Sequence, residues 1–359
     1  MRRDLRRNAP RHLRFAAALT VAALGLMACG SSNETARPET PGAPSTSAAP
    51  ESDLKVGLAY DVGGRGDRSF NDAAAAGLDK AVAELGIEKE ELSPNASGSD
   101  RGDNLRSLAE GGFNPVIAVG FAYAESLEPI ATDFPDTTFL IVDDSSVKAP
   151  NVKALLFAEE QGSFLVGAAA ALKSKTGNVG YIGGVETPLL KKFQAGFAAG
   201  AKQVKPDIKI QAKYLSQPPD FSGFSSPDKG RETANGMYDA GADVIYAAAG
   251  GSGTGVFQAA LAKKTLAIGV DSDQYESIGD ATLQPVILTS MLKRVDVAVF
   301  ETLEKFAKDE EIPAQTVFDL EVDGVGYSES GGFVTDIAPQ LEELKAKIID
   351  GTIKVPTTP

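Results

Sequence analysis

Short apolar runs alternate with helix-like segments along most of this chain, and this alternation restricts its fold more than any other feature. Beyond residue 54, most apolar runs have the length of a buried strand and precede a segment of helical composition. Repeated strand–helix units predict parallel sheets with right-handed crossover connections. In the first series, strands are predicted over 56–60, 116–119, 138–142 and 152–157, and helices over 73–85, 101–110, 124–132 and 161–172.

A second series of the same kind begins at Asn178. Two such series in 359 residues predict two similar α/β lobes, each with a doubly wound parallel sheet. In this series, strands are predicted over 179–182, 208–214, 244–248 and 267–270, and helices over 189–204, 230–240 and 256–264.

The chain is expected to cross between the lobes more than once. A long strand over 285–292 is predicted to return to the first lobe, with a helix over 296–308 after it. A strand over 317–322 and a helix over 337–349 then close the fold, without assignment to a lobe. The predicted organisation is a first lobe over 54–157 completed by about 286–310, a second lobe over 158–285, and a C-terminal segment over 311–359 that packs on the lobes.

The N-terminal residues have the pattern of a lipoprotein signal peptide. A basic segment over 2–14 precedes an apolar run over 15–27 that is too short for a permanent membrane span, and small Ala28 stands before Cys29. This predicts a signal peptide over 1–28 and lipidation of Cys29. Residues 29–53 are rich in Ser, Pro, Thr, Ala and Glu, which predicts a disordered tether. The folded body is therefore expected outside the cytoplasm, anchored to the cell membrane.

Charge and residue usage exclude several classes of function. The formal net charge is −14, and the first 28 residues are basic, so the remainder is still more acidic. Such a charge argues against nucleic-acid binding. His12 and Cys29 are the only histidine and cysteine of the chain. Removal of the signal peptide would therefore leave no histidine for acid–base catalysis and no His/Cys set for zinc, and no cofactor or metal is expected.

The polar turn after the first strand carries the residue types of a ligand site. It contains Asp61, three glycines, Phe70 and Asn71, and it lies where the first predicted strand gives way to the first helix. In open α/β sheets, ligands bind beyond the carboxyl ends of the strands. This mixture of an acid, an aromatic ring and an amide suits a small polar ring compound.

Loops after later strands add further candidates. The candidates that follow predicted strands are Asp143 or its neighbour Asp144, a G-G-V-E-T-P loop followed by Phe193, a glycine-rich loop with Gly250, and Asp271. Lys293 sits on the strand that is expected to cross between the lobes. Phe70 and Phe193 from opposite lobes would sandwich a flat base, since stacking is worth about 1–3 kcal/mol per base. Asp271 would accept the hydroxyls of a ribose, as acids do in dinucleotide sites, while Asn71 and Asp143 would read the base edge.

Each of these residues also has a purely structural interpretation. The two phenylalanines would serve as core residues, the strand-end aspartates as helix caps, and Lys293 as half of a surface ion pair. The loop over 250–255 has the context of a phosphate cradle but lacks the lysine of a P-loop, which favours contact with a neutral group. The segment over 218–224 fits a plain surface loop.

The pattern D-x-G-G-x-x-D-x-S-F-N-x-x-x-x-x-G, which begins at Asp61, resembles the signature of the basic membrane lipoprotein family. That family comprises substrate-binding lipoproteins of ABC importers, including purine nucleoside receptors. The segment over 188–197 and the residues around Lys293 are similar to it as well. The resemblance implies the type I periplasmic-binding-protein fold with a three-segment hinge. It also implies a pocket formed by Asp61, Phe70, Asn71, Asp143, Phe193, Gly250, Asp271 and Lys293.

The sequence therefore predicts a monomeric, lipid-anchored solute-binding protein that captures a nucleoside, a purine nucleoside above all, and presents it to an ABC permease. Three alternatives stay open. The first is a nucleoside-cleaving enzyme on the same scaffold, the second is a signalling receptor or adhesin, and the third is a sugar-type ligand in place of a nucleoside. Fold alone does not separate them.

Overall fold

The strand-like runs of the sequence form two parallel-dominated sheets in the computed structural model, which describes residues 52–359. The predicted signal peptide, Cys29 and nearly all of the predicted tether lie outside this range. In sheet order, the first sheet contains β11 (Gln315–Phe318), β5 (Val152–Phe157), β4 (Phe139–Val142), β3 (Val116–Ala118), β1 (Lys55–Ala59) and β2 (Glu88–Leu92). The second contains β12 (Val325–Tyr327), β10 (Ile287–Lys293), β9 (Leu266–Asp271), β8 (Val244–Ala248), β6 (Asn178–Val185) and β7 (Lys209–Ser216).

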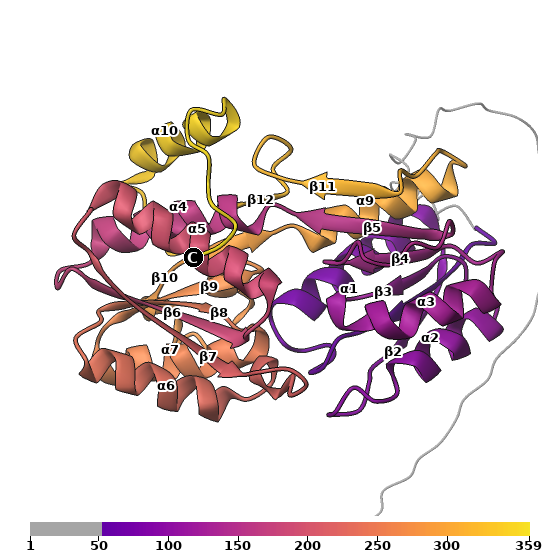
Figure 1. Cartoon of the computed structure of the whole chain (residues 1–359), viewed down its shortest axis with the longest axis horizontal. Helices are drawn as coiled ribbons and strands as arrows, with labels where there is room; N and C mark the ends of the chain where they lie inside the picture. Colours follow the sequence, from indigo (N-terminus) through magenta and orange to yellow (C-terminus); the bar gives the residue numbers. More distant parts are fainter. Residues whose placement is uncertain (1–51) are drawn as a thin grey trace, which may run out of the picture. The chain divides into compact units, whose positions relative to one another are not determined.

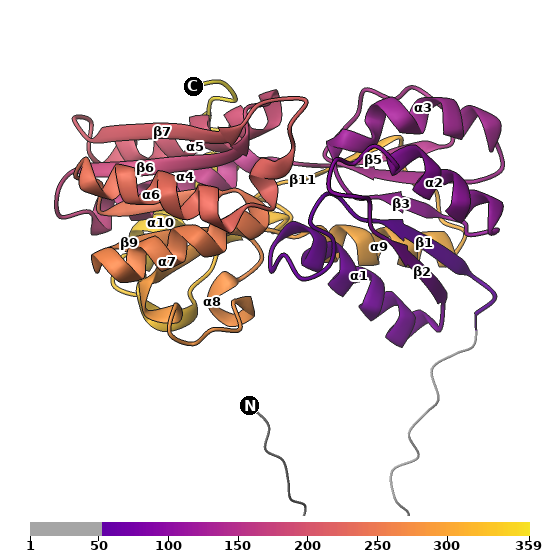
Figure 2. The same ribbon diagram turned by 90° about the horizontal axis from the view of Figure 1, so that it is seen from below.

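Helices cover both faces of each sheet (Figures 1 and 2). The first sheet has a hydrophobic core on each of its faces, because successive strand residues point to opposite sides. In β4, Leu140 packs in the cluster that contains helices α1 and α9, whereas Ile141 packs against α2 and α3. The first lobe contains α1 (Phe70–Leu85), α2 (Arg101–Glu110), α3 (Ala124–Asp133) and α9 (Val295–Ala307). The second contains α4 (Glu159–Lys173), α5 (Pro188–Val204), α6 (Pro227–Asp239), α7 (Gly253–Lys263), α8 (Gln274–Ser277) and α10 (Ala338–Ile349). In residues 52–359, no helix is long and apolar enough to cross a membrane.

Strand β10 corrects one prediction. The sequence suggested that residues 285–292 return to the first lobe, but β10 pairs in parallel with β9 and antiparallel with β12, inside the second sheet. Its apolar composition shows that it is buried without showing which strand it pairs with. The chain returns to the first lobe only after Lys293, and α9 then packs on α1. The crossings β5–α4, β10–α9 and β11–β12 make three connections, as the family resemblance implies.

Three other elements differ from the sequence predictions. Strand β2 was missed because its residues, Glu88–Leu92, are mostly charged, as an edge strand allows. Helix α1 begins at Phe70, three residues earlier than predicted, so Phe70 and Asn71 belong to its first turn. The C-terminal segment does more than pack on the lobes, because it supplies β11 to the first sheet and β12 to the second.

Glycines let helices α4 and α5 approach each other closely. A Cβ atom on Gly200 would lie 1.9 Å from the Phe164 carbonyl oxygen, and one on Gly167 would lie 2.1 Å from the Phe197 carbonyl oxygen. Neither helix can therefore carry a side chain at these positions without moving its partner. This contact anchors α5, the helix that carries Phe193.

We expect Gly200→Ala to lower the free energy of unfolding by about 1–3 kcal/mol, because the added methyl group meets a backbone atom that cannot rotate away. The control is Gly236→Ala in helix α6, where nothing lies within 4 Å of the added atom. That change should be neutral or stabilising by up to about 1 kcal/mol, since alanine favours a helix. Urea denaturation measures both. Equal effects at the two positions would contradict the close contact.

Candidate functional site

A cavity lies at the carboxyl ends of the parallel strands, where loops of the two lobes face each other. All eight residues that the sequence predicted for the site line it: Asp61, Phe70, Asn71, Asp143, Phe193, Gly250, Asp271 and Lys293. The remaining lining residues are mostly apolar and include Phe121, Leu189, Leu190, Phe224 and Val270.

Asp61 follows strand β1 and is held by a buried arginine. Its Oδ1 accepts hydrogen bonds from Arg101 Nη2 at 2.8 Å and from the backbone N–H of Val62 at 2.7 Å. Its own N–H donates to Asn71 Oδ1 at 2.9 Å. Burial raises the pKa of Asp61, and the Arg101 guanidinium opposes that rise. With Oδ1 occupied by these two donors, Oδ2 is the oxygen that we expect to serve a ligand.

The first turn of helix α1 is organised by Asp67, which belongs to the signature that begins at Asp61 but was not predicted to line the pocket. Its carboxylate accepts the backbone N–H groups of Ser69, Asn71 and Asp72 at 2.9–3.1 Å. It also accepts Asn71 Nδ2 at 3.1 Å. These bonds satisfy N–H groups that the start of a helix leaves without partners. They explain why the helix begins at Phe70 and why the Asn71 side chain is fixed.

Lys293 lies at the centre of a buried charge cluster. Its Nζ is 2.5 Å from Asp143 Oδ2 and 3.4 Å from Glu159 Oε1, and all three side chains are at most 4% exposed. Burial alone would lower the pKa of Lys293, but the carboxylates of Asp143 and Glu159 outweigh it and raise that pKa. Asp143 Oδ1 is buried and has no hydrogen-bond partner within the described residues. That oxygen is therefore available to a donor on a ligand.

Asp143, not Asp144, belongs to the cavity. Asp144 Oδ1 instead accepts the N–H and hydroxyl groups of Ser146 at 2.6–2.7 Å. Asp143 and Asp271 both adopt left-handed backbone angles, with φ of +69° and +63°. Non-glycine residues seldom adopt such angles, and those that do concentrate at functional sites. The strained turns aim both carboxylates into the space between the lobes.

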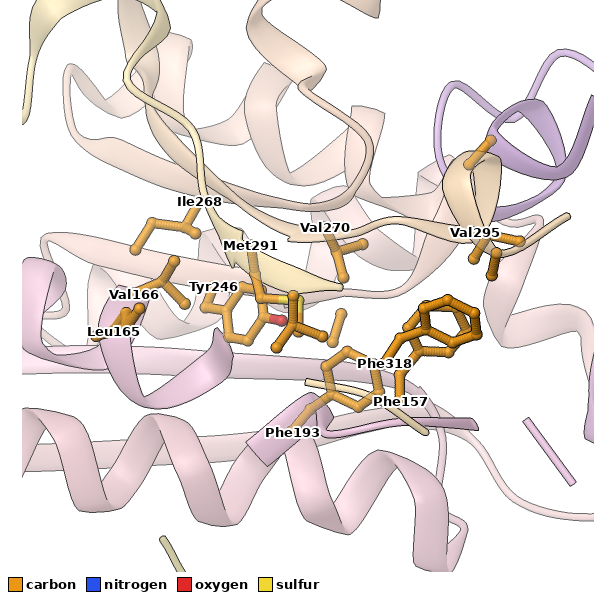
Figure 3. Packing of buried hydrophobic residues seen from close by; sticks show 14 of the residues in the cluster. Phe157, Leu165, Val166, Phe193, Tyr246, Ile268, Val270, Met291, Val295 and Phe318 are labelled. Atoms are coloured by element: carbon orange, nitrogen blue, oxygen red, sulfur yellow. The ribbon is translucent and has the colours of Figure 1, made fainter. Parts of the chain in front are cut away.

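The two predicted phenylalanines have different surroundings. Phe193 is 4% exposed and packs in the cluster of buried side chains that also contains Phe157 (Figure 3). Phe70 is only half-buried. The Lys293 ammonium lies 5.0 Å from the Phe70 ring centroid and 5.6 Å from that of Phe193, so both rings lie close to the same buried charge. The sequence left open whether Phe193 is a core residue or a cavity residue, and in the structure it is both.

Direct bonds join the lobes beside the cavity. Ser69 Oγ, from the first lobe, donates to Asp271 Oδ2 in the second at 2.6 Å, and Gln274 Nε2 donates to the Arg68 carbonyl oxygen at 3.0 Å. The Arg68 guanidinium in turn donates to the Ile278 carbonyl oxygen. Burial raises the pKa of Asp271, with Lys293 and Ser69 opposing. These contacts describe a closed arrangement of the two lobes.

Several residues of the site carry no local sequence signal. Arg101 and Glu159 reach the cavity region from helices α2 and α4, and Phe224 lines the wall. The segment over 218–224, interpreted as a surface loop, supplies Phe224 to the cavity and places Phe221 against Arg101 of the other lobe. That interpretation was wrong, and only contacts distant in sequence reveal the difference.

Asp67 gives the site a dependence on pH. Burial raises its pKa to about 6 from an ordinary value of 3.8. A raised carboxyl pKa stabilises the folded state at low pH, and this contribution is lost as pH rises through about 6. We expect the unfolding free energy of the wild type, minus that of Asp67→Asn, to fall by up to about 3 kcal/mol between pH 4 and pH 7. Urea denaturation across this range measures the difference, and a constant value would contradict the assignment.

Comparison with known proteins identifies the family of this chain. The profile of the Bmp family, described as "ABC transporter substrate-binding protein PnrA-like", matches residues 54–359. The chain belongs to the Bmp family. It is 38% identical over 325 residues to a CD4+ T-cell-stimulating antigen of Listeria monocytogenes, which covers 86% of this chain and 89% of the relative. It is 34% identical over 330 residues to the ABC transporter nucleoside-binding protein BmpA of Lactococcus lactis, covering 87% and 92% of the two chains.

Solved structures agree with this assignment. An ABC transporter solute-binding protein of Aeropyrum pernix superposes with a TM-score of 0.72 at 28% identity, over 85% of this chain and 93% of that one. The fold is therefore that of the periplasmic binding proteins, and this Bmp-family chain is an ABC transporter substrate-binding protein. Its cavity lies where two lobes meet, as a protein that captures a solute by closing requires.

Proposed function

We propose that this Bmp-family protein captures a nucleoside, with purine nucleosides preferred, and presents it to an ABC permease. The observation that carries the proposal is the cavity itself. Phe70 and Phe193 come from opposite lobes and flank one space, and Asp61, Asp143 and Asp271 surround the same space with acceptors. A flat base between the rings and a diol beside the carboxylates would use both features. The name of the Lactococcus lactis relative supports the same ligand class.

The charge of the cavity favours a nucleoside over a nucleotide. Its lining contains Asp61, Asp67, Asp143 and Asp271 against a single cation, Lys293, which is already paired with Asp143. A phosphate would therefore meet an excess of carboxylates, whereas ribose hydroxyls and base amino groups are donors. The glycine loop at Gly250 does not suit a phosphate, because the acidic residue Asp67 lies directly beside it. A Cβ atom added to Gly251 would lie 3.7 Å from the Cβ of Asp67.

Capture proceeds by hinge closure. A ligand that contacts both lobes binds the closed state more tightly than the open state, and this difference shifts the population toward closure. The hydrogen bonds from Ser69 to Asp271 and from Arg68 to Ile278 stabilise the closed state in addition to the ligand's own contacts. No bond of the ligand is broken. We further propose that the protein acts as a monomer held outside the cytoplasm by lipid on Cys29, as its N-terminal sequence predicts.

A thermal-shift screen of the purified protein against nucleosides, bases, sugars and amino acids tests the ligand class. Inosine, guanosine and adenosine should stabilise the protein, by about 2.7 kcal/mol at a hundredfold excess over the dissociation constant. Stabilisation by sugars alone would show that the ligand is a sugar and not a nucleoside. Release of free base during incubation would favour an enzyme, and unchanged nucleoside uptake after gene deletion would favour a signalling receptor or adhesin.

A further inference from the structure

Arg101 is buried, although it does not line the cavity. The residue is 6% exposed, and its Nη2 holds Asp61 Oδ1 at 2.8 Å. Its other polar bond is a long one, from Nη1 to the Gly98 carbonyl oxygen at 3.3 Å, and its Nε has no partner within the described residues. A buried guanidinium with so few hydrogen bonds depends strongly on the groups packed against it.

One of those groups comes from the other lobe. Phe221 belongs to the segment between β7 and α6, in the second lobe, and its ring centroid lies 5.1 Å from the Arg101 guanidinium carbon. Phe221 also contacts Phe121 of the first lobe, with ring centroids 6.0 Å apart. Tyr123 lies 5.7 Å from the same guanidinium carbon. An aromatic ring from across the cleft thus packs on the arginine that holds a cavity carboxylate.

Opening of the lobes would separate this contact. Phe221 would leave with the second lobe, and water would reach the Arg101–Asp61 ion pair. Ion pairs weaken as the surrounding dielectric rises, so Asp61 would be held less firmly in the open state. Closure would restore the contact, exclude water and return Asp61 to a fixed position. Cavity geometry and lobe closure are therefore coupled through Arg101.

We propose that Arg101 and Phe221 form a latch across the cleft that positions Asp61 on the ligand and slows ligand release. Arg101 is a positioning residue, because it acts through Asp61 and not by touching the ligand. The inference rests on the nucleoside binding proposed above and adds to it the residues that set the lifetime of the complex. It also assigns a role to the segment over 218–224.

Dissociation of inosine from the full chain carrying Cys29→Ser, followed by stopped flow, tests the latch. Phe221→Ala should raise the dissociation rate by about two- to thirtyfold, the range expected from losing one cation–π contact. Phe221→Tyr, which keeps a ring, should restore most of the slow rate. Arg106→Met is the matched control: Arg106 lies on the same helix, but its ion pair with Asp133 is exposed. Its dissociation rate should stay at the wild-type value.

A double-variant cycle separates a latch from a general packing role. If Arg101 and Phe221 act together, Phe221→Ala should add little to the effect of Arg101→Met. Independent, additive effects would overturn the latch, as would an unchanged dissociation rate in Phe221→Ala. Should Arg101→Met fail to fold, the comparison of Phe221→Ala with Phe221→Tyr still decides the outcome.

A second measurement distinguishes failure of the latch from failure of the nucleoside proposal. If the wild type binds no nucleoside, the proposed ligand is wrong, and the latch is tested without ligand. Glu128→Cys and Glu232→Cys place spin labels on exposed positions of the two lobes, in a chain whose only native cysteine is replaced. Phe221→Ala should enlarge the population with long interlobe distances. An unchanged distance distribution would overturn the latch whatever the ligand proves to be.

Discussion

Lys293→Met is expected to lower the free energy of unfolding by about 3–5 kcal/mol at neutral pH, because it removes one partner of a buried ion pair. Met291, two residues earlier on β10, is already a fully buried methionine, so the strand accommodates this side chain. The cost therefore comes from charge. Asp143 would be left buried without the ammonium, and Glu159 would keep only Lys192, 2.9 Å away. Nucleoside binding should be lost as well, since Lys293 lines the cavity.

The loss should depend on pH and on Asp143. Burial already raises the pKa of Asp143 to about 7, and without Lys293 that pKa should rise further, so protonation would remove the unpaired charge as the pH falls toward neutral. The destabilisation by Lys293→Met should thus shrink as the pH falls from about 9 to about 7. Adding Asp143→Asn should recover part of the stability at pH 7. Urea denaturation of both variants measures this, and an equal or larger loss in the double variant would contradict the assigned ion pair.

Phe193→Ala should cost about 3–5 kcal/mol of stability, the usual range for removing a buried phenylalanine. It should also weaken nucleoside binding by about 1–3 kcal/mol if the ring stacks on the base. Phe70→Ala should weaken binding to a similar extent with a smaller loss of stability, because Phe70 is half-buried whereas Phe193 is 4% exposed. The two variants therefore separate the stacking role from the core role.

Titration calorimetry with inosine and urea denaturation together measure this contrast. Phe193→Leu is the control, since leucine fills much of the core space but offers no ring to a base. It should keep most of the stability and still bind more weakly than the wild type. Unchanged affinity in both Phe70→Ala and Phe193→Ala would show that the base does not lie between the rings.

Much of the site was predictable because parallel strands bring their carboxyl ends to one edge of a sheet. Asp61, Asp143, Asp271 and Lys293 each follow or end a strand, and all of them line the cavity. An apolar run is visible in the sequence, and the residue after it is then placed by topology alone. The family signature around Asp61 added the expectation that these loops serve one pocket.

Residues that depend on pairing between distant segments were not predictable in this way. Glu88–Leu92 reads as a polar stretch, yet it forms edge strand β2 because β1 offers it a partner. Asp67 is a local case that was overlooked: its bonds reach residues only two to five positions further along the chain, and they decide where α1 begins. For β2, a local pattern was overruled by a contact that the sequence does not display; for Asp67, an acid just before a helix was a signal that the sequence did display.

The sequence by itself determined the α/β class, the two lobes, the Bmp-family resemblance and the eight residues that surround the cavity. The periodicity of burial and the ends of strands can be predicted from the local spacing of apolar and polar residues. Only the tertiary structure decided that β10 belongs to the second sheet, that Glu159 joins the Lys293 cluster, and that Phe221 reaches Arg101 across the cleft. These facts rest on which surfaces meet in three dimensions, and partner choice between distant segments leaves no periodic trace in the chain.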